Sequence, residues 1–166
     1  GLSALRSRLN IPVVGPGQAC FLTAAMLGHR FSVVTMWDRW KPLYRKVALE
    51  LEMQSRLASI ESIDTRPDAE ELLAGKEEVV FAKLETAARR AIDQHGADVI
   101  ILGSTTMHQS AEYLSNALEV PVLNPGLVAL KHCEILVQLS LSHSKLAYQP
   151  PAALSDEVLA AVPPVF

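Results

Sequence analysis

Residues 97–109 read Ala97-Asp98-Val99-Ile100-Ile101-Leu102-Gly103-Ser104-Thr105-Thr106-Met107-His108-Gln109. The stretch contains a short apolar run rich in β-branched residues, residues 99–102, which is typical of a buried strand in a parallel sheet. A glycine and three hydroxyl residues follow, and a helical pattern then begins. The stretch therefore predicts a strand–loop–helix unit whose loop lies at the carboxyl end of the strand.

The hydroxyl residues of this loop have two interpretations. Open α/β sheets bind small ligands at the carboxyl ends of their strands, and a loop that leads into a helix offers N–H and hydroxyl groups to an anion. Ser104, Thr105 and Thr106 suit such a carboxylate-binding loop. Serine and threonine are also preferred helix N-caps, so a cap without a ligand explains the same pattern.

Short apolar runs and helical patterns alternate along the chain. The expected strands are 30–35, 57–63, 99–102 and 120–123. The expected helices are 2–9, 18–27, 42–53, 69–74, 76–94, 108–116, 127–139 and a short piece between the proline pairs at 150–151 and 163–164. This alternation predicts βαβ units. The fold class is therefore α/β, with a mostly parallel sheet and helices on both faces.

Composition narrows the function classes. The 166 residues carry a net charge of −3, so no basic face is implied and nucleic acid is not an expected partner. No apolar run has the length of a membrane span, and no signal peptide pattern is present, so no membrane association is expected. Two cysteines, Cys20 and Cys133, do not form a disulfide framework, which favours a reducing, cytoplasmic setting.

Familiar catalytic motifs do not occur. Neither GxGxxG nor GxxxxGK[ST] is present, so a dinucleotide or P-loop nucleotide is not supported. The histidines are scattered, and no metal site is indicated. The residues around Ser104 do not form the GxSxG elbow of serine hydrolases, although His108 lies four residues on. Cys20 is expected to be a small buried hydrophobe, with a reactive thiol as the alternative.

Three parts of the chain carry a resemblance to a known family. They are residues 12–19 followed by 28–35, residues 96–105, and residues 120–126 followed by a helix and residues 140–145. Together they resemble the aspartate/glutamate/hydantoin racemase family, and most of all its hydantoin racemase branch. The resemblance covers nearly the whole chain, and residues 96–105 are similar to a family segment that ends in Leu-Gly-Cys-Thr.

The resemblance implies a fold of two α/β lobes, of which this chain holds one lobe and part of the other. Residues 1–14 would be the end of the first lobe, 15–123 the second lobe with the Ser104 loop, and 124–166 a helix and tail that return to the first lobe. Gly1-Leu2 resembles the end of the family's Cys-Phe-x-Asp-Pro-Gly-Leu motif. We therefore expect the family's first active-site cysteine upstream of Gly1.

The family's chemistry is proton transfer without a cofactor. One thiolate removes the proton from a carbon next to a carbonyl, and a second thiol returns a proton to the opposite face. Backbone N–H and hydroxyl groups hold the carboxylate or imide and the developing enolate. The resemblance thus implies a cofactor-independent amino acid or hydantoin racemase-like isomerase, a small carboxylate or hydantoin as substrate, and a homo-oligomer.

The chain departs from the family at its second cysteine, which maps onto Ser104. A serine hydroxyl is a poor proton donor or acceptor without a partner base, so racemisation would be impaired. Ser104 is either native or an engineered replacement, and the differences at 106–109 favour a natural branch. Alternatives are a one-cysteine decarboxylase or isomerase relative and a non-catalytic small-molecule binding protein. The expected catalytic residue is Ser104, and the expected substrate-binding residues are Thr35, Gly103, Thr105, Thr106 and Asn124.

Overall fold

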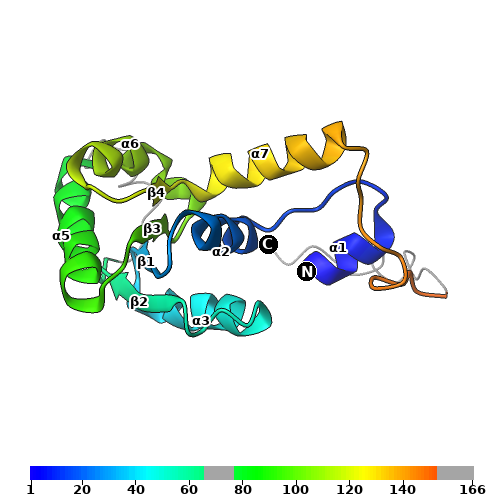
Figure 1. The fold of residues 1–166 in the computed structure, drawn as a ribbon, viewed down its shortest axis with the longest axis horizontal. Helices are drawn as coiled ribbons and strands as arrows, with labels where there is room; N and C mark the ends of the chain where they lie inside the picture. The colour runs from blue at the N-terminus through cyan, green and yellow to red at the C-terminus, as the bar shows by residue number, and fades with distance from the viewer. Residues whose placement is uncertain (66–76, 153–166) are drawn as a thin grey trace, which may run out of the picture. The chain divides into compact units, whose positions relative to one another are not determined.

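The computed structural model describes residues 1–65 and 77–152, with the side chains of 77–79 left aside. The described residues form two compact units (Figure 1). Unit 1 combines Gly1–Val13 with the described residues from Cys133 onward, and unit 2 is Val14–His132. The helices expected at 69–74 and between the terminal proline pairs lie outside the described residues. The assignment of residues to racemase lobes stays a prediction.

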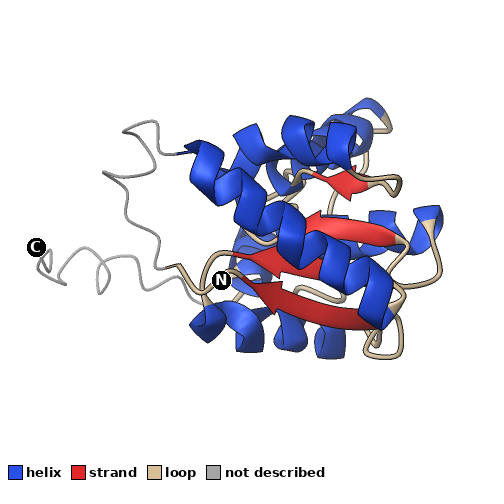
Figure 2. Ribbon diagram, turned by 90° about the vertical axis from the view of Figure 1, so that its left-hand side faces the viewer, coloured by secondary structure: helices blue, strands red, loops and turns tan. Residues whose placement is uncertain are grey.

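Unit 2 is built on a parallel sheet. Its described strands are β1 (Phe31–Thr35), β2 (Leu57–Ser62), β3 (Val99–Leu102) and β4 (Val122–Leu123). They form a four-stranded sheet in the order β2-β1-β3-β4, with every neighbouring pair parallel (Figure 2). The two central strands are buried along their whole length, which explains why β3 is a continuous apolar run rather than an alternating one. The predicted parallel α/β sheet is confirmed.

Helices cover both faces of this sheet (Figure 2). The helices α2 (Pro16–Leu27) and α3 (Lys41–Glu50) pack on one face, where Phe21, Phe31 and Ile101 belong to one apolar cluster. The helices α5 (Glu77–His95) and α6 (His108–Ala117) pack on the other face, where Leu84, Ile100 and Leu114 belong to a second cluster. Alternate residues of β3 supply the two clusters, as strand geometry requires.

Proline explains two of the differences between the predicted and the observed element boundaries. β4 includes only Val122 and Leu123 of the four residues expected, and Pro121 joins the sheet only through its carbonyl, which accepts from the N–H of Ile100 at 2.9 Å. α7 (Pro125–Gln138) begins two residues earlier than predicted, because proline is favoured in the first helical turn. Of the described helices, none is long and apolar enough to cross a lipid bilayer.

Polar side chains organise unit 1 around α1 (Leu2–Arg8). Lys145 Nζ donates to the carbonyls of Arg6, Ser7 and Leu9 at 2.8, 3.0 and 2.6 Å, and so satisfies acceptors that the end of the helix leaves open. His143 Nε2 accepts the N–H of Val13 at 2.7 Å. Burial, followed by the positive charges of Arg6 and Lys145, lowers the pKa of His143 and keeps its ring neutral for this bond.

Asp98 ties the beginnings of the two central strands together. Its carboxylate oxygens accept the N–H groups of His29 and Arg30 at 2.8 and 2.9 Å. Partial burial raises the pKa of Asp98, but these hydrogen bonds outweigh it, so the pKa lies below its ordinary value. Gly28 leaves room for the carboxylate, since a Cβ at residue 28 would overlap Asp98 and stand 2.8 Å from a methyl group of Val99.

We predict that Gly28→Ala lowers the free energy of unfolding by about 2–3 kcal/mol, because the added methyl group displaces Asp98 or Val99. Gly17→Ala is the matched control. Residue 17 lies in α2, and its new methyl group would contact only Val47 of α3, at 3.8 Å. Because alanine also favours a helix more than glycine does, the variant should be neutral or slightly more stable. Urea denaturation measures both, and equal stability of the two variants would contradict the packing described for Gly28.

Asp98→Asn should lower the free energy of unfolding at neutral pH by about 1 kcal/mol, because solvent partly screens the charged hydrogen bonds. The lowered folded-state pKa means that the carboxylate stabilises the protein above its ordinary pKa of 3.8, and that this contribution is lost as the pH falls through the folded value. The difference in the free energy of unfolding between the wild type and Asp98→Asn should therefore shrink as the pH falls from neutral to about 3, as denaturation curves at each pH would measure. A constant difference between the two proteins would contradict the assignment.

Candidate functional site

The carboxyl end of β3 is closely packed around Gly103. The N–H of Gly103 donates to the carbonyl of Val34 at 2.8 Å and so continues the sheet by one residue. A Cβ at Gly103 would lie 2.6 Å from Tyr44 Oη and 2.7 Å from Thr35 Cβ. Close approach of neighbouring side chains therefore requires glycine at this position.

Tyr44 reaches this point from α3. Its hydroxyl donates to the carbonyl of Gly103 at 2.5 Å and lies 2.9 Å from Thr35 Oγ1. A tyrosine hydroxyl has one proton, so Thr35 is the donor in the second bond. Burial raises the pKa of Tyr44, and the hydrogen bond with Thr35 opposes this only in part. The phenol is therefore neutral near pH 7 and acts as a hydrogen-bond donor.

The hydroxyl residues after Gly103 are joined to one another. Ser104 Oγ lies 2.8 Å from Thr106 Oγ1 and accepts the N–H of Thr106 at 3.3 Å. Ser104 thereby caps the short 3₁₀ helix η2 (Thr105–Met107), which leads directly into α6. Ser104 is therefore a helix cap, as the second interpretation of this loop predicts. The same residue also lines the cavity described next.

A cavity of about 310 Å³ opens beside this loop within unit 2. Its walls come from the first turns of α2, from the face of α3 that carries Tyr44, from the end of β3 and from Pro125. Gly103, Ser104 and Thr105 supply its polar edge. Of the described residues that line it, none carries a formal charge. Its size and its mainly apolar walls are those of a small-molecule site.

The residues predicted to bind substrate do not all reach this cavity. Gly103, Ser104 and Thr105 line the cavity. Thr35 does not line it, and its hydroxyl is hydrogen-bonded to the hydroxyl of Tyr44. Asn124 Oδ1 accepts the N–H groups of Gly126 and Leu127 at 3.1 and 3.3 Å and so caps α7. The substrate contacts of all these residues stay predictions.

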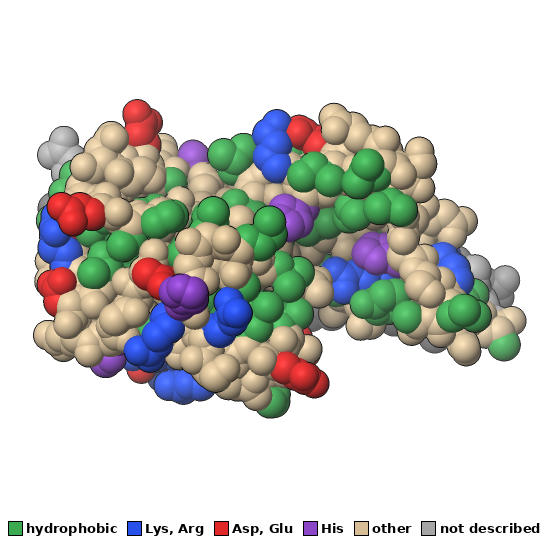
Figure 3. Space-filling model, viewed as in Figure 1, with side chains coloured by type: hydrophobic (Ala, Val, Ile, Leu, Met, Phe, Trp, Pro, Cys, Tyr) green, Lys and Arg blue, Asp and Glu red, His purple; other side chains and the backbone are tan. Residues whose placement is uncertain are grey.

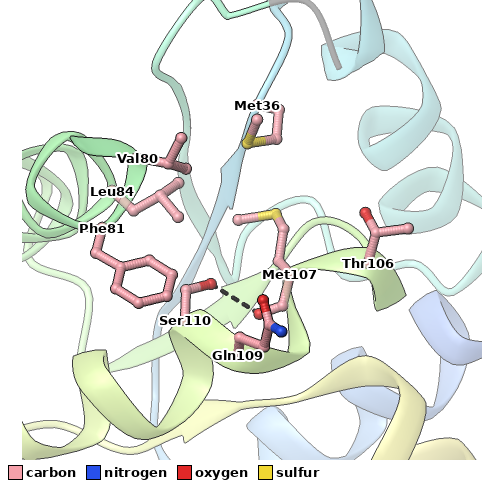
Figure 4. A pocket seen from close by; sticks show the side chains of 8 residues that line it. All are labelled: Met36, Val80, Phe81, Leu84, Thr106, Met107, Gln109 and Ser110. Atoms are coloured by element: carbon pink, nitrogen blue, oxygen red, sulfur yellow. Dashed lines mark hydrogen bonds between the residues drawn. The ribbon is translucent and has the colours of Figure 1, made fainter. Parts of the chain in front are cut away.

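Thr106 borders a second and much smaller cavity of about 20 Å³. Figure 4 shows Thr106 standing apart from the apolar side chains of Met36, Leu84 and Phe81. Ser110 Oγ donates to the carbonyl of Met107 at 2.7 Å on the same side of the loop. A cavity of this volume holds about one water molecule, so the larger cavity is the candidate ligand site.

Neither cysteine lies at the candidate site. Cys20 is fully buried on α2 between the helix and the sheet, and burial raises its pKa to about 12. It therefore has almost no thiolate at neutral pH. Cys133 is a partly exposed free cysteine on α7. Within the described part of the chain, no three histidine, cysteine or acidic side chains are grouped as metal ligands.

Sequence reasoning did not identify Tyr44 as a polar residue of the site. The sequence places it on the helix that follows β1, but helix periodicity alone does not indicate whether its hydroxyl contacts the loop after β3. On the face that Figure 3 shows, acidic and basic side chains lie among exposed hydrophobic ones. The loop after β3, with Tyr44 behind it, is therefore the candidate site.

Comparison with known proteins identifies a family of similar sequences. The family model "Asp/Glu/Hydantoin racemase" matches residues 1–133. Hydantoin racemase of Pseudomonas sp. (strain NS671) is 33% identical over 151 residues, which cover 88% of this chain and 57% of that protein. Hydantoin racemase of Paenarthrobacter aurescens is 31% identical over 152 residues, which cover 91% and 63%. The chain thus spans about three fifths of the length of these relatives.

The fold is similar to that of solved racemase structures. Allantoin racemases of Klebsiella pneumoniae and Pseudomonas fluorescens each match with a TM-score of 0.83 and 32% identity over 93% of this chain, covering 63% and 65% of their own lengths. A glutamate racemase of Bacillus anthracis matches with a TM-score of 0.58 at 20% identity, which shows likeness of fold alone.

A thiol-reactive reagent at about pH 8 should label Cys133 in the native protein and leave Cys20 unmodified. Each unit of raised pKa lowers the thiolate share about tenfold, and the buried position of Cys20 also excludes the reagent. Mass spectrometry of peptides identifies the modified cysteine, and labelling after unfolding in urea is the control. Fast native labelling of Cys20 would contradict its placement between α2 and the sheet.

Proposed function

The chain belongs to the Asp/Glu/hydantoin racemase family, and we propose that its β3 cavity binds a hydantoin-type ring for proton transfer at the ring carbon next to a carbonyl. The observation that carries this proposal is the uncharged cavity of about 310 Å³ whose polar edge is Gly103, Ser104 and Thr105. Family membership supplies the class of reaction, and the cavity supplies the class of substrate.

The lining favours a neutral ring over a free amino acid. An amino acid brings a carboxylate and an ammonium group, and burying either without a partner costs several kcal/mol or more. A hydantoin ring instead presents carbonyl and N–H groups that neutral donors and acceptors can satisfy. The relatives named for hydantoin and allantoin act on molecules that contain this ring, which supports the same choice.

The loop after β3 would hold the carbonyl oxygen on which charge develops. Backbone N–H groups and hydroxyls in a fixed loop stabilise an enolate because they need no reorientation as the charge forms. Ser104 and Thr105 supply such groups at the cavity edge, and the Ser104–Thr106 hydroxyl pair fixes part of the loop. In this proposal Thr105 binds substrate, and Ser104 stands where the resemblance places the family's second cysteine.

Ser104 limits what the loop can do as a base. A cysteine thiol has a pKa of about 8.5, whereas a serine hydroxyl stays protonated at neutral pH unless a base activates it. Ser104 Oγ is paired with the neutral Thr106 hydroxyl, which is not a base. This pairing favours, as the second candidate, a protein that binds the ring with little turnover. The one-cysteine decarboxylase or isomerase, the homo-oligomer and the cytoplasmic setting stay predictions.

Ser104→Cys provides the test. We expect this variant to exchange the C5 hydrogen of 5-methylhydantoin with D₂O at least about tenfold faster than the wild type, because a thiolate can remove the proton. Proton NMR of the C5 signal measures the exchange. Exchange with D₂O requires only one group that removes and returns the proton, whereas racemisation requires two groups on opposite sides of the ring. The wild type should bind the same compound with slow exchange.

Ser115→Cys is the matched control, since residue 115 is an exposed position of α6 that does not line the cavity. The proposal is wrong if Ser104→Cys exchanges the C5 hydrogen no faster than Ser115→Cys. It is also wrong if the wild type binds aspartate or glutamate in preference to 5-methylhydantoin, because the uncharged lining predicts the opposite order.

A further inference from the structure

One side chain is hydrogen-bonded to the peptide group that leads into the candidate site. Tyr44 Oη donates to the Gly103 carbonyl at 2.5 Å, and the hydroxyl of the fully buried Thr35 holds the phenol in place at 2.9 Å. Thr35 is the last residue of β1, so the phenol is anchored on the central part of the sheet. The hydrogen bond therefore links the α3 helix, the β1 strand and the loop after β3.

The Gly103 carbonyl and the Ser104 N–H belong to one trans peptide plane and point in opposite directions. A bond that fixes the carbonyl therefore fixes the N–H as well, together with the position of the Ser104 Cα at the end of the same plane. Glycine has more backbone freedom than any other residue, so this peptide needs an external restraint. Tyr44 supplies such a restraint from the side, through a donor that stays protonated near neutral pH.

We propose that Tyr44 is a positioning residue of the candidate site. Its hydroxyl holds the Gly103–Ser104 peptide in the orientation that places residue 104 on the cavity, and the aromatic ring forms part of the cavity wall. This inference rests on the function proposed above. Tyr44 acts through the peptide and exchanges no proton with the substrate itself.

Tyr44→Phe removes the hydroxyl and keeps the ring, so the cavity wall is preserved. In the Ser104→Cys background, we expect this change to lower kcat for C5 hydrogen exchange of 5-methylhydantoin about tenfold, because the peptide that carries the thiol-bearing residue loses its fixed orientation. KM should change by less than about twofold, because the walls that bind the ring are intact.

Tyr113→Phe is the matched control. It removes the same atom from a tyrosine whose hydroxyl donates to Glu85 at 2.6 Å, away from the cavity lining. Its kcat and KM should equal those of the parent. Equal kcat in Tyr44→Phe and the parent would overturn the inference, and so would parallel changes in kcat and KM accompanied by a lower Tm, which indicate general destabilisation.

A measurement without substrate separates this inference from the proposed function. The ¹⁵N order parameter of the Ser104 amide should be lower in Tyr44→Phe than in the wild type, while that of the Ile100 amide within β3 is unchanged. An unchanged order parameter at Ser104 overturns the inference even if activity falls. If Ser104→Cys does not exchange the C5 hydrogen at all, the proposed function fails, and the order parameters alone decide whether Tyr44 positions the peptide.

Discussion

The contact of Tyr44, Thr35 and Gly103 at the carboxyl end of β3 is the constraint on which the candidate site depends. It requires glycine at 103, because a Cβ would fall within 2.8 Å of both neighbouring side chains. It also requires β1 and β3 to be adjacent and parallel, so that Thr35 and Gly103 lie at the same edge of the sheet. The cavity beside Ser104 follows from this packing, since α3 carries both Tyr44 and part of the cavity wall.

The local sequence predicts the sheet well because its central strands are buried on both faces. The run 99–102 has a single stable environment, between two layers of helices, and it is found there. The start of β4 was predicted less well, because Pro121 contributes only a hydrogen-bond acceptor to the sheet. The position of a polar loop at a strand end was also predictable, since parallel strands with helical connections bring such loops to one edge.

The partners of individual side chains could not be predicted in the same way. Asn124 stays a predicted substrate-binding residue, and the sequence did not indicate that its side-chain oxygen accepts two N–H groups of the helix that follows it, as short polar side chains often do. Thr106 is likewise paired with Ser104. Tyr44 was missed because its partner Gly103 lies 59 residues away, and helix periodicity gives a face but not the atom that a hydroxyl reaches.

The central claim is that the loop from Gly103 to Thr105 and the apolar walls opposite it bind a neutral five-membered ring. Titration of 5-methylhydantoin into the ¹⁵N-labelled protein tests it most directly. The account predicts saturable shifts of the amide signals of Gly103, Ser104, Thr105 and Gly17, with no comparable shifts on addition of aspartate. Shifts confined to residues outside the cavity, or a response to aspartate alone, would contradict it.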